Sequence, residues 1–145
     1  MSAGQICSRV VATAVPDETV RTAAARMAAT DVGTLVVVDP NRRRVVVGIV
    51  TDRDITVRCV ALGLDPVETA ISDVMSTPVQ SIDENTPIEE TVQMMARTNT
   101  RRLIVTNAEA GFVGIISLDD VLELFTTEAG AISRLLGRQA PHLPS

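Results

Sequence analysis

The chain has 145 residues, of which 46% are hydrophobic and 1% aromatic, and its formal net charge is -5. A chain of this length buries a single core of ordinary size, and here that core must be aliphatic. The negative charge argues against nucleic-acid binding, because neutralising phosphates requires a basic face. Two cysteines and one histidine are too few for a recognisable metal site or a cysteine–histidine catalytic pair.

The chain shows neither a basic-then-apolar leader nor an apolar run long enough to span a bilayer. These features predict a cytoplasmic protein with no membrane partner. No base, nucleophile or metal constellation emerges beyond isolated carboxylates, so the sequence does not predict an enzyme.

The first predicted elements are a strand and a helix. Residues 6–15 are expected to form a leading segment that ends in a short strand. Asp17 and Thr19 then offer cap oxygens for an amphipathic helix of roughly ten residues. Its apolar face recurs at helical spacing and comprises Val20, Ala23, Ala24 and Met27.

Two apolar runs follow, which predict strands over 35–38 and 45–50 joined by a hairpin connection at 39–44. The pattern is again helical over 52–62. Residues 65–68 then read as the start of a short helix, because a cap residue, a proline and a glutamate follow in the expected order.

The same order of predicted elements recurs in the second half of the chain. Residues 74–79 align with the leading segment at an offset of 68. Thr86 and Pro87 are predicted to be the N-cap and the first residue of a second long helix. Strands are expected over 103–105 and 112–116.

The last predicted helix covers 118–125. It is followed by a stretch with helical potential at 126–137 and by a frayed tail that ends at Ser145.

The clearest sign of duplication is the segment 48–55 (GIVTDRDI), which recurs 66 residues later as 114–121 (GIISLDDV). Each copy ends an apolar run with a hydroxyl residue and places a carboxylate three residues later. We interpret the chain as a tandem duplication in which each repeat runs strand, helix, strand, strand, helix. Half-domains of this size are marginal alone, so the repeats should pack together about a pseudo-twofold axis.

The predicted organisation has four parts. The first repeat covers 6–64, a linker covers 65–73, the second repeat covers 74–125, and a C-terminal extension covers 126–145.

These residues resemble the tandem CBS domain pair, a family named after cystathionine β-synthase and also called the Bateman module. The resemblance covers roughly residues 6–125 and is most specific in the two motif copies. It implies an α/β (α+β) fold and a regulatory module without catalysis of its own. It also implies that AMP, ADP, ATP or a related adenosyl ligand binds between the repeats, with no cofactor required.

In this family the motif hydroxyl meets phosphate, the aspartate binds the ribose hydroxyls, and the opposite repeat completes each cleft. The resemblance implies a first cleft in which two arginines can neutralise a phosphate chain. Its residues are Thr51, Asp54, Thr77, Pro78, Val79, Thr100, Arg101 and Arg102. The implied second cleft has one cation and suits a less charged ligand or none. Its residues are Ser117, Asp120, Arg9, Val11 and Thr34.

The motif residues also have a simpler explanation. A hydroxyl followed by a carboxylate at the third helical position is close to a capping box, which stabilises a helix by about 1 kcal/mol without any ligand. Two hypotheses therefore stay open. One is a nucleotide-responsive module that acts on an effector protein in trans, and the other is a dimerisation or interaction scaffold whose clefts are vestigial.

The resemblance further implies a homodimer formed through helices. The apolar residues that offer surface for it are Ile55, Val57, Val60, Ala61, Val121, Leu122, Leu124 and Phe125. Cys7 aligns with Met75, and Cys59 lies on a predicted helix, so both cysteines read as packing residues.

Overall fold

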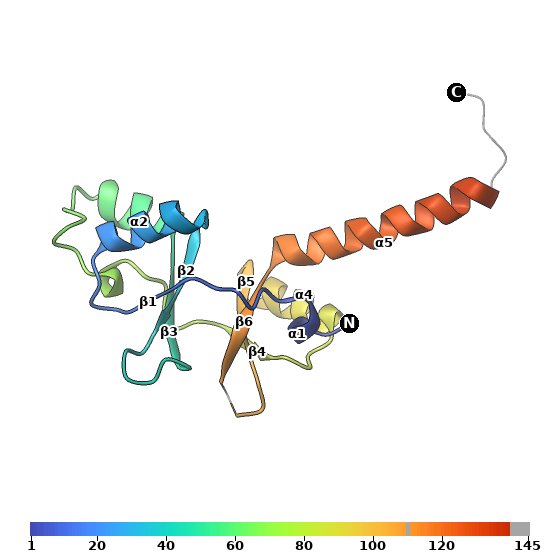
Figure 1. Ribbon diagram of the computed structural model, residues 1–145, viewed down its shortest axis with the longest axis horizontal. Helices are drawn as coiled ribbons and strands as arrows, with labels where there is room; N and C mark the ends of the chain where they lie inside the picture. Colours follow the sequence, from blue (N-terminus) through green and yellow to red (C-terminus); the bar gives the residue numbers. More distant parts are fainter. Residues whose placement is uncertain (110, 140–145) are drawn as a thin grey trace, which may run out of the picture.

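In the computed structural model, which describes residues 1–109 and 111–139, each repeat forms its own three-stranded sheet (Figure 1). The first strand of each sheet is parallel to the second, and the second is antiparallel to the third. The strands are β1 (Thr13–Ala14), β2 (Thr34–Val38), β3 (Val46–Thr51), β4 (Ser81–Asp83), β5 (Arg102–Thr106) and β6 (Phe112–Ser117). The predicted duplication and the mixed α+β class are confirmed.

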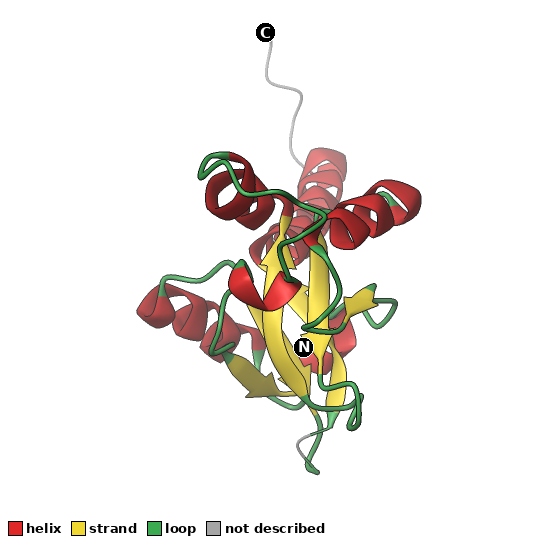
Figure 2. Ribbon diagram, turned by 90° about the vertical axis from the view of Figure 1, so that its left-hand side faces the viewer, coloured by secondary structure: helices red, strands yellow, loops and turns green. Residues whose placement is uncertain are grey.

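Helices surround the strands, which lie in the middle of the molecule (Figure 2). They are α1 (Ala3–Ile6), α2 (Val20–Thr30), α3 (Asp52–Ile55), the π-helical turn η1 (Thr56–Val60), the 3-10 turn η2 (Ile71–Asp73), α4 (Ile88–Thr98) and α5 (Leu118–Gln139). The sequence did not predict α1 or η2, because single turns are too short to show a helical period.

The predicted start of α2 is confirmed, and that of α4 is wrong by one residue. Thr19 caps α2 by accepting a hydrogen bond from the amide of Thr22 at 3.1 Å. Helix α4 begins at Ile88, and Pro87 is its N-cap rather than its first residue, because the Pro87 backbone is extended (ψ 152°). The preceding carbonyl, that of Thr86, accepts a hydrogen bond from the amide of Ala3 at 2.8 Å and so ties this corner to α1.

Residues 65–68 form a turn and not the predicted short helix. The Asp65 side chain accepts from the amide of Val67 at 2.9 Å, as a cap would. The next carbonyls, however, serve another helix, because Pro66 accepts from Arg21 at 3.0 Å and Thr69 from Val20 at 2.9 Å. The segment therefore satisfies the first amides of α2 instead of its own helix.

Two helices differ in extent from the prediction. The predicted helix over 52–62 is divided into α3 and η1. The predicted helix over 118–125 and the helical stretch after it form one continuous helix, α5, of 22 residues. The predicted frayed tail, 140–145, lies outside the described residues. No helix within 1–109 and 111–139 has the length and apolar content needed to cross a membrane.

The core of each repeat is completed by residues that lie next to the other repeat in the sequence. Ile71 and Val74 are fully buried in the core of the first sheet, beside Leu35 and Val50. Ala3 is fully buried in the core of the second sheet. The two repeats are therefore interlocked, a feature that the predicted packing about a pseudo-twofold axis did not include.

After each of these two segments, the backbone pairs with the hairpin of the repeat whose core the segment completes. Ser8 exchanges two hydrogen bonds with Ile115 of β6, at 2.8 and 3.0 Å. Ser76 exchanges two with Ile49 of β3, at 2.8 and 3.1 Å. A third apolar cluster, formed around Val36 and Ile104, joins the two sheets between these crossings.

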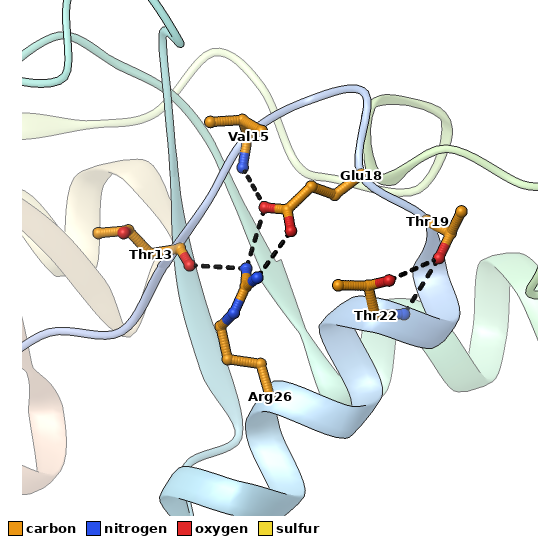
Figure 3. A network of polar contacts seen from close by, with 6 residues as sticks. All are labelled: Thr13, Val15, Glu18, Thr19, Thr22 and Arg26. Carbon is orange, nitrogen blue, oxygen red and sulfur yellow. Dashed lines mark hydrogen bonds and ion pairs between the residues drawn. The ribbon is translucent and has the colours of Figure 1, made fainter.

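A polar network fastens α2 to the segment that leads into it (Figure 3). The Arg26 guanidinium donates to the Thr13 carbonyl at 2.9 Å and to both carboxylate oxygens of Glu18, at 3.0 and 2.6 Å. Glu18 also accepts from the amide of Val15 at 2.9 Å. The Arg26 hydrogen bonds lower the pKa of the Glu18 carboxyl, because they favour its ionised form.

We expect Glu18→Gln to lower the free energy of unfolding at neutral pH by up to about 1 kcal/mol, the range of a partly exposed ion pair. The folded-state pKa of Glu18 is depressed, so this stabilisation is complete above the unfolded pKa of about 4.3 and is lost as pH falls through the folded value. Urea unfolding of both proteins across this range measures it. A difference that stays constant into acid would contradict the assignment.

Candidate ligand-binding site

Both motif copies form complete capping boxes. In the first, the Thr51 hydroxyl accepts from the amide of Asp54 at 3.1 Å, and the Asp54 carboxylate accepts from the amide of Thr51 at 2.9 Å. Ser117 and Asp120 make the same pair of bonds at the same two distances. Capping therefore accounts for these residue types in both repeats. Each carboxylate uses one of its two oxygens for the capping hydrogen bond.

The two helix starts differ in one amide. At α3, the amide of Arg53 donates to the side chain of Asp52 at 2.9 Å. At α5, the residue equivalent to Asp52 is Leu118, which has no acceptor. Within the described chain, the amide of Asp119 makes no hydrogen bond. Of these two helix starts within the described residues, that of α5 therefore keeps a free donor in its first turn, where a helix attracts anions.

A cavity of about 330 Å³ lies where the two helix starts meet. We call it the junction cavity, and its lining residues are Thr51, Asp52, Arg53, Arg101, Arg102, Ser117, Leu118 and Asp119. The arginines of the second repeat, Arg101 and Arg102, therefore line the same cavity as Thr51 of the first motif. Ser117 of the second motif lines this cavity as well.

A second cavity, of about 310 Å³, opens beside Asp120. This Asp120 cavity combines residues of both repeats, namely Ser8, Val10, Val11, Ala12, Val32, Gly33, Thr34, Arg102, Ile115, Ser117 and Asp120. Its walls are mainly aliphatic, and Val10 is 96% exposed to solvent. Within the described residues, the second carboxylate oxygen of Asp120 makes no hydrogen bond.

The residues implied for the second cleft come together, with one exception. Ser117, Asp120, Val11 and Thr34 all line the Asp120 cavity. Arg9 does not, and its guanidinium donates to the carbonyl of Gly4 at 2.9 Å. The cation of this cavity is Arg102 instead.

The residues implied for the first cleft are dispersed. Thr51, Arg101 and Arg102 share the junction cavity. The others line neither of the two cavities; they are Asp54, Thr77, Pro78, Val79 and Thr100. The Thr77 hydroxyl donates to the Val47 carbonyl at 3.0 Å, and the Thr100 hydroxyl donates to the Arg102 carbonyl at 3.0 Å.

The sequence analysis assigned Arg102 to the first cleft only, whereas the structure places it in the lining of both cavities. Hairpin register explains this, because Arg102 on β5 is paired with Ser117 on β6. Directly paired residues project from the same face of a sheet. If the predicted strands 103–105 and 112–116 had been extended to Arg102 and Ser117, the sequence would have indicated this pairing.

Neither cysteine takes part in the site. Cys59 is fully buried in the first core, and Cys7 is half-buried. Burial raises the pKa of the Cys7 thiol, because it disfavours the thiolate. In the portion of the chain that the structure describes, no three His, Cys, Asp or Glu side chains are placed to hold a metal ion.

These features define an internally duplicated α+β module with a mainly aliphatic cavity between its repeats. The chain belongs to the CBS domain family, whose model matches residues 3–60 and 71–126.

Two curated relatives show how far the similarity extends. The chain is 36% identical over 134 residues to the CBS domain-containing protein YhcV of Bacillus subtilis, a match that covers 91% of this chain and 92% of the relative. It is 32% identical over 124 residues to an uncharacterized protein of Methanopyrus kandleri, covering 86% of this chain but only 62% of that longer protein.

A solved structure is similar over nearly its whole length. It is a CBS domain protein from Pyrobaculum aerophilum complexed with AMP, with a TM-score of 0.74 and 26% identity. The match covers 87% of this chain and 99% of the other.

Proposed function

We propose that the chain is a non-catalytic regulatory module that binds an adenosyl ligand in the Asp120 cavity and acts on a partner protein in trans. The observation that carries the proposal is the composition of this cavity. It joins an aliphatic wall, a carboxylate with one free oxygen and an arginine, which are drawn from both repeats. Its volume lies near the lower limit of small-molecule sites, which span roughly 300–1,000 Å³.

The aliphatic wall suits a flat base. Val10, Val32 and Ile115 line the cavity, and Val10 is almost fully exposed to solvent. Covering a valine side chain with an apolar surface contributes about 1.5 kcal/mol or more. The chain has no aromatic residue in this lining, so the base would lie between aliphatic side chains.

Asp120 suits the ribose. One of its oxygens is held by the amide of Ser117 at 2.9 Å, which fixes the orientation of the carboxylate. An ionised carboxylate has further acceptor capacity, so its other oxygen can accept from the two hydroxyls of a cis diol.

Arg102 suits the phosphate, because it lines the Asp120 cavity and the junction cavity alike. A phosphate placed there lies between this guanidinium and the free amide of Asp119 at the start of α5. Arg101 and Arg53 supply two further cations for a longer phosphate chain, although the carboxylates of Asp52 and Asp119 line the same cavity. The ligand class is therefore AMP, ADP, ATP or a related adenosyl compound, and the AMP complex of the similar Pyrobaculum protein supports this class.

Helix α5 is the element through which a bound ligand would reach a partner. It begins at the cavity with Ser117 as its cap and then leaves the body of the protein (Figure 1). A ligand can change the partner's binding only through its difference in affinity between two states.

A scaffold with vestigial clefts remains the second candidate, and the capping boxes favour it. They account for Thr51, Asp54, Ser117 and Asp120 without any ligand.

Isothermal titration calorimetry with AMP, ADP and ATP separates the two. We expect at least one nucleotide to bind the wild-type chain. We expect Asp120→Ala to weaken that binding about tenfold or more, because a hydrogen bond to a charged group contributes about 1.5–3 kcal/mol. Absence of heat with all three nucleotides, for folded protein, would leave the scaffold hypothesis.

Asp54→Ala is the matched control. It removes the same type of cap but does not line the Asp120 cavity. Both variants should lose about 1 kcal/mol of stability, yet only Asp120→Ala should lose affinity. Equal losses of affinity would show that capping, and not ligand contact, explains the effect.

A further inference from the structure

The junction cavity is lined by charges of both signs. Its anions are Asp52, at the start of α3, and Asp119, at the start of α5. Its cations are three arginines, namely Arg53, Arg101 and Arg102. Within residues 1–109 and 111–139, neither aspartate forms an ion pair with one of these arginines. Both carboxylates therefore act directly on a charged group that enters the cavity.

The two helix starts supply these charges unequally. The motif copies are offset by 66 residues, so the residue equivalent to Arg53 is Asp119. The first copy thus places a cation, and the second an anion, at the second residue of its helix. Asp119 belongs to the same helix start as Ser117 and Asp120, which line the Asp120 cavity. The helix start proposed to receive a phosphate therefore carries a carboxylate beside it.

Both aspartates also stabilise their helices. A carboxylate in the first turn interacts favourably with the helix dipole, and Asp52 in addition accepts a hydrogen bond from the amide of Arg53 at 2.9 Å. These structural roles explain the residue types without a ligand. They do not remove the effect on a ligand, because the same two charges line the cavity.

A first phosphate is favoured where the two cavities adjoin. Arg102 lines both of them, and a guanidinium can bind phosphate through two parallel hydrogen bonds. Further phosphates would extend into the junction cavity, where the other two arginines are matched in number by the two aspartates. Like charges repel more strongly in a cavity than in bulk water, because the local dielectric constant is lower. Each added phosphate therefore brings negative charge against a lining that offers no further net positive charge.

We propose that Asp52 and Asp119 make the nucleotide site selective for a single phosphate, so that the chain binds AMP in preference to ADP and ATP. This inference rests on the proposed function, because it concerns the ligand of the Asp120 cavity. The selectivity arises from repulsion of the longer phosphate chain and not from an additional contact with AMP.

Isothermal titration calorimetry with adenosine, AMP, ADP and ATP tests the preference, with EDTA present to remove divalent cations. We expect AMP to bind about tenfold or more tightly than adenosine, because its phosphate gains charge-assisted hydrogen bonds to Arg102. We expect AMP to bind about fivefold or more tightly than ATP, which is the effect of one like charge about 4 Å away in water. ATP that binds as tightly as AMP would overturn the selectivity and leave the proposed function intact. Absence of binding by all four compounds would overturn both.

The magnesium complex of ATP is the second arm of this experiment. We expect it to bind no more tightly than AMP. Tighter binding of the complex would show that Asp52 and Asp119 hold a cation, and it would overturn their assignment as repulsive groups.

Asp119→Asn tests the residue assignment, because it removes the charge and nearly keeps the shape. The ratio of ATP affinity to AMP affinity should rise about fivefold, and Asp52→Asn should change the ratio in the same direction. Glu123→Gln is the matched control, since Glu123 lies one turn further along α5, is exposed and lines neither cavity. It should leave the ratio unchanged, and circular dichroism checks that each variant is folded. A wild-type ratio in both aspartate variants, or an equal rise in Glu123→Gln, would overturn the assignment.

Discussion

Gly114→Ala is expected to lower the free energy of unfolding by about 3 kcal/mol, at the upper end of the usual range for overpacking. A Cβ at this position would meet the carbonyl oxygen of Ser8 well inside van der Waals contact. That oxygen cannot move away cheaply, because it accepts the hydrogen bond from the amide of Ile115 at 3.0 Å. Urea unfolding measures the loss.

Gly48→Ala is the matched control, because Gly48 holds the equivalent place in the first motif. Its Cβ would meet mainly the side chain of Met75, and the carbonyl oxygen of Ser76 would be 3.2 Å away. A methionine side chain has three rotatable bonds and can be displaced, so we expect a loss of only about 1 kcal/mol. Equal losses in the two variants would contradict the tighter crossing at Gly114.

The second large effect is expected for Ile71→Ala. Ile71 is fully buried in the core of the first sheet, although it belongs to the predicted linker. Truncating a buried isoleucine to alanine costs about 2–5 kcal/mol, because apolar burial is lost and a cavity remains.

Ser72→Ala changes the next, exposed residue and should alter stability by no more than about 0.5 kcal/mol. Thermal and urea unfolding of both variants provide the comparison. A loss below about 1 kcal/mol for Ile71→Ala would mean that this segment is a linker and not part of the first core.

The sequence by itself determined the duplication, the strand and helix order of each repeat, and the helix caps at Thr19, Thr51 and Ser117. These features depend on neighbours within a few residues, namely apolar periodicity and a hydroxyl beside the amides that it caps. The same local patterns misplaced the start of α4 at Pro87 and predicted a helix at residues 65–68. In both places, backbone carbonyls are used by a distant segment.

The tertiary structure decided which residues share a cavity. The capping boxes are alike in both repeats, yet Asp120 lines a cavity and Asp54 lines neither of the two. The difference arises from Arg102 and Val10, which are brought to Asp120 by strand register and by the crossing of the leading segment onto β6. Such contacts join residues far apart in the chain, so the spacing of neighbouring residues does not predict them. Helical potential at residues 126–137 could be predicted from the sequence, but only the structure shows that this part of α5 continues the helix with no buried residue between Leu122 and Gly137.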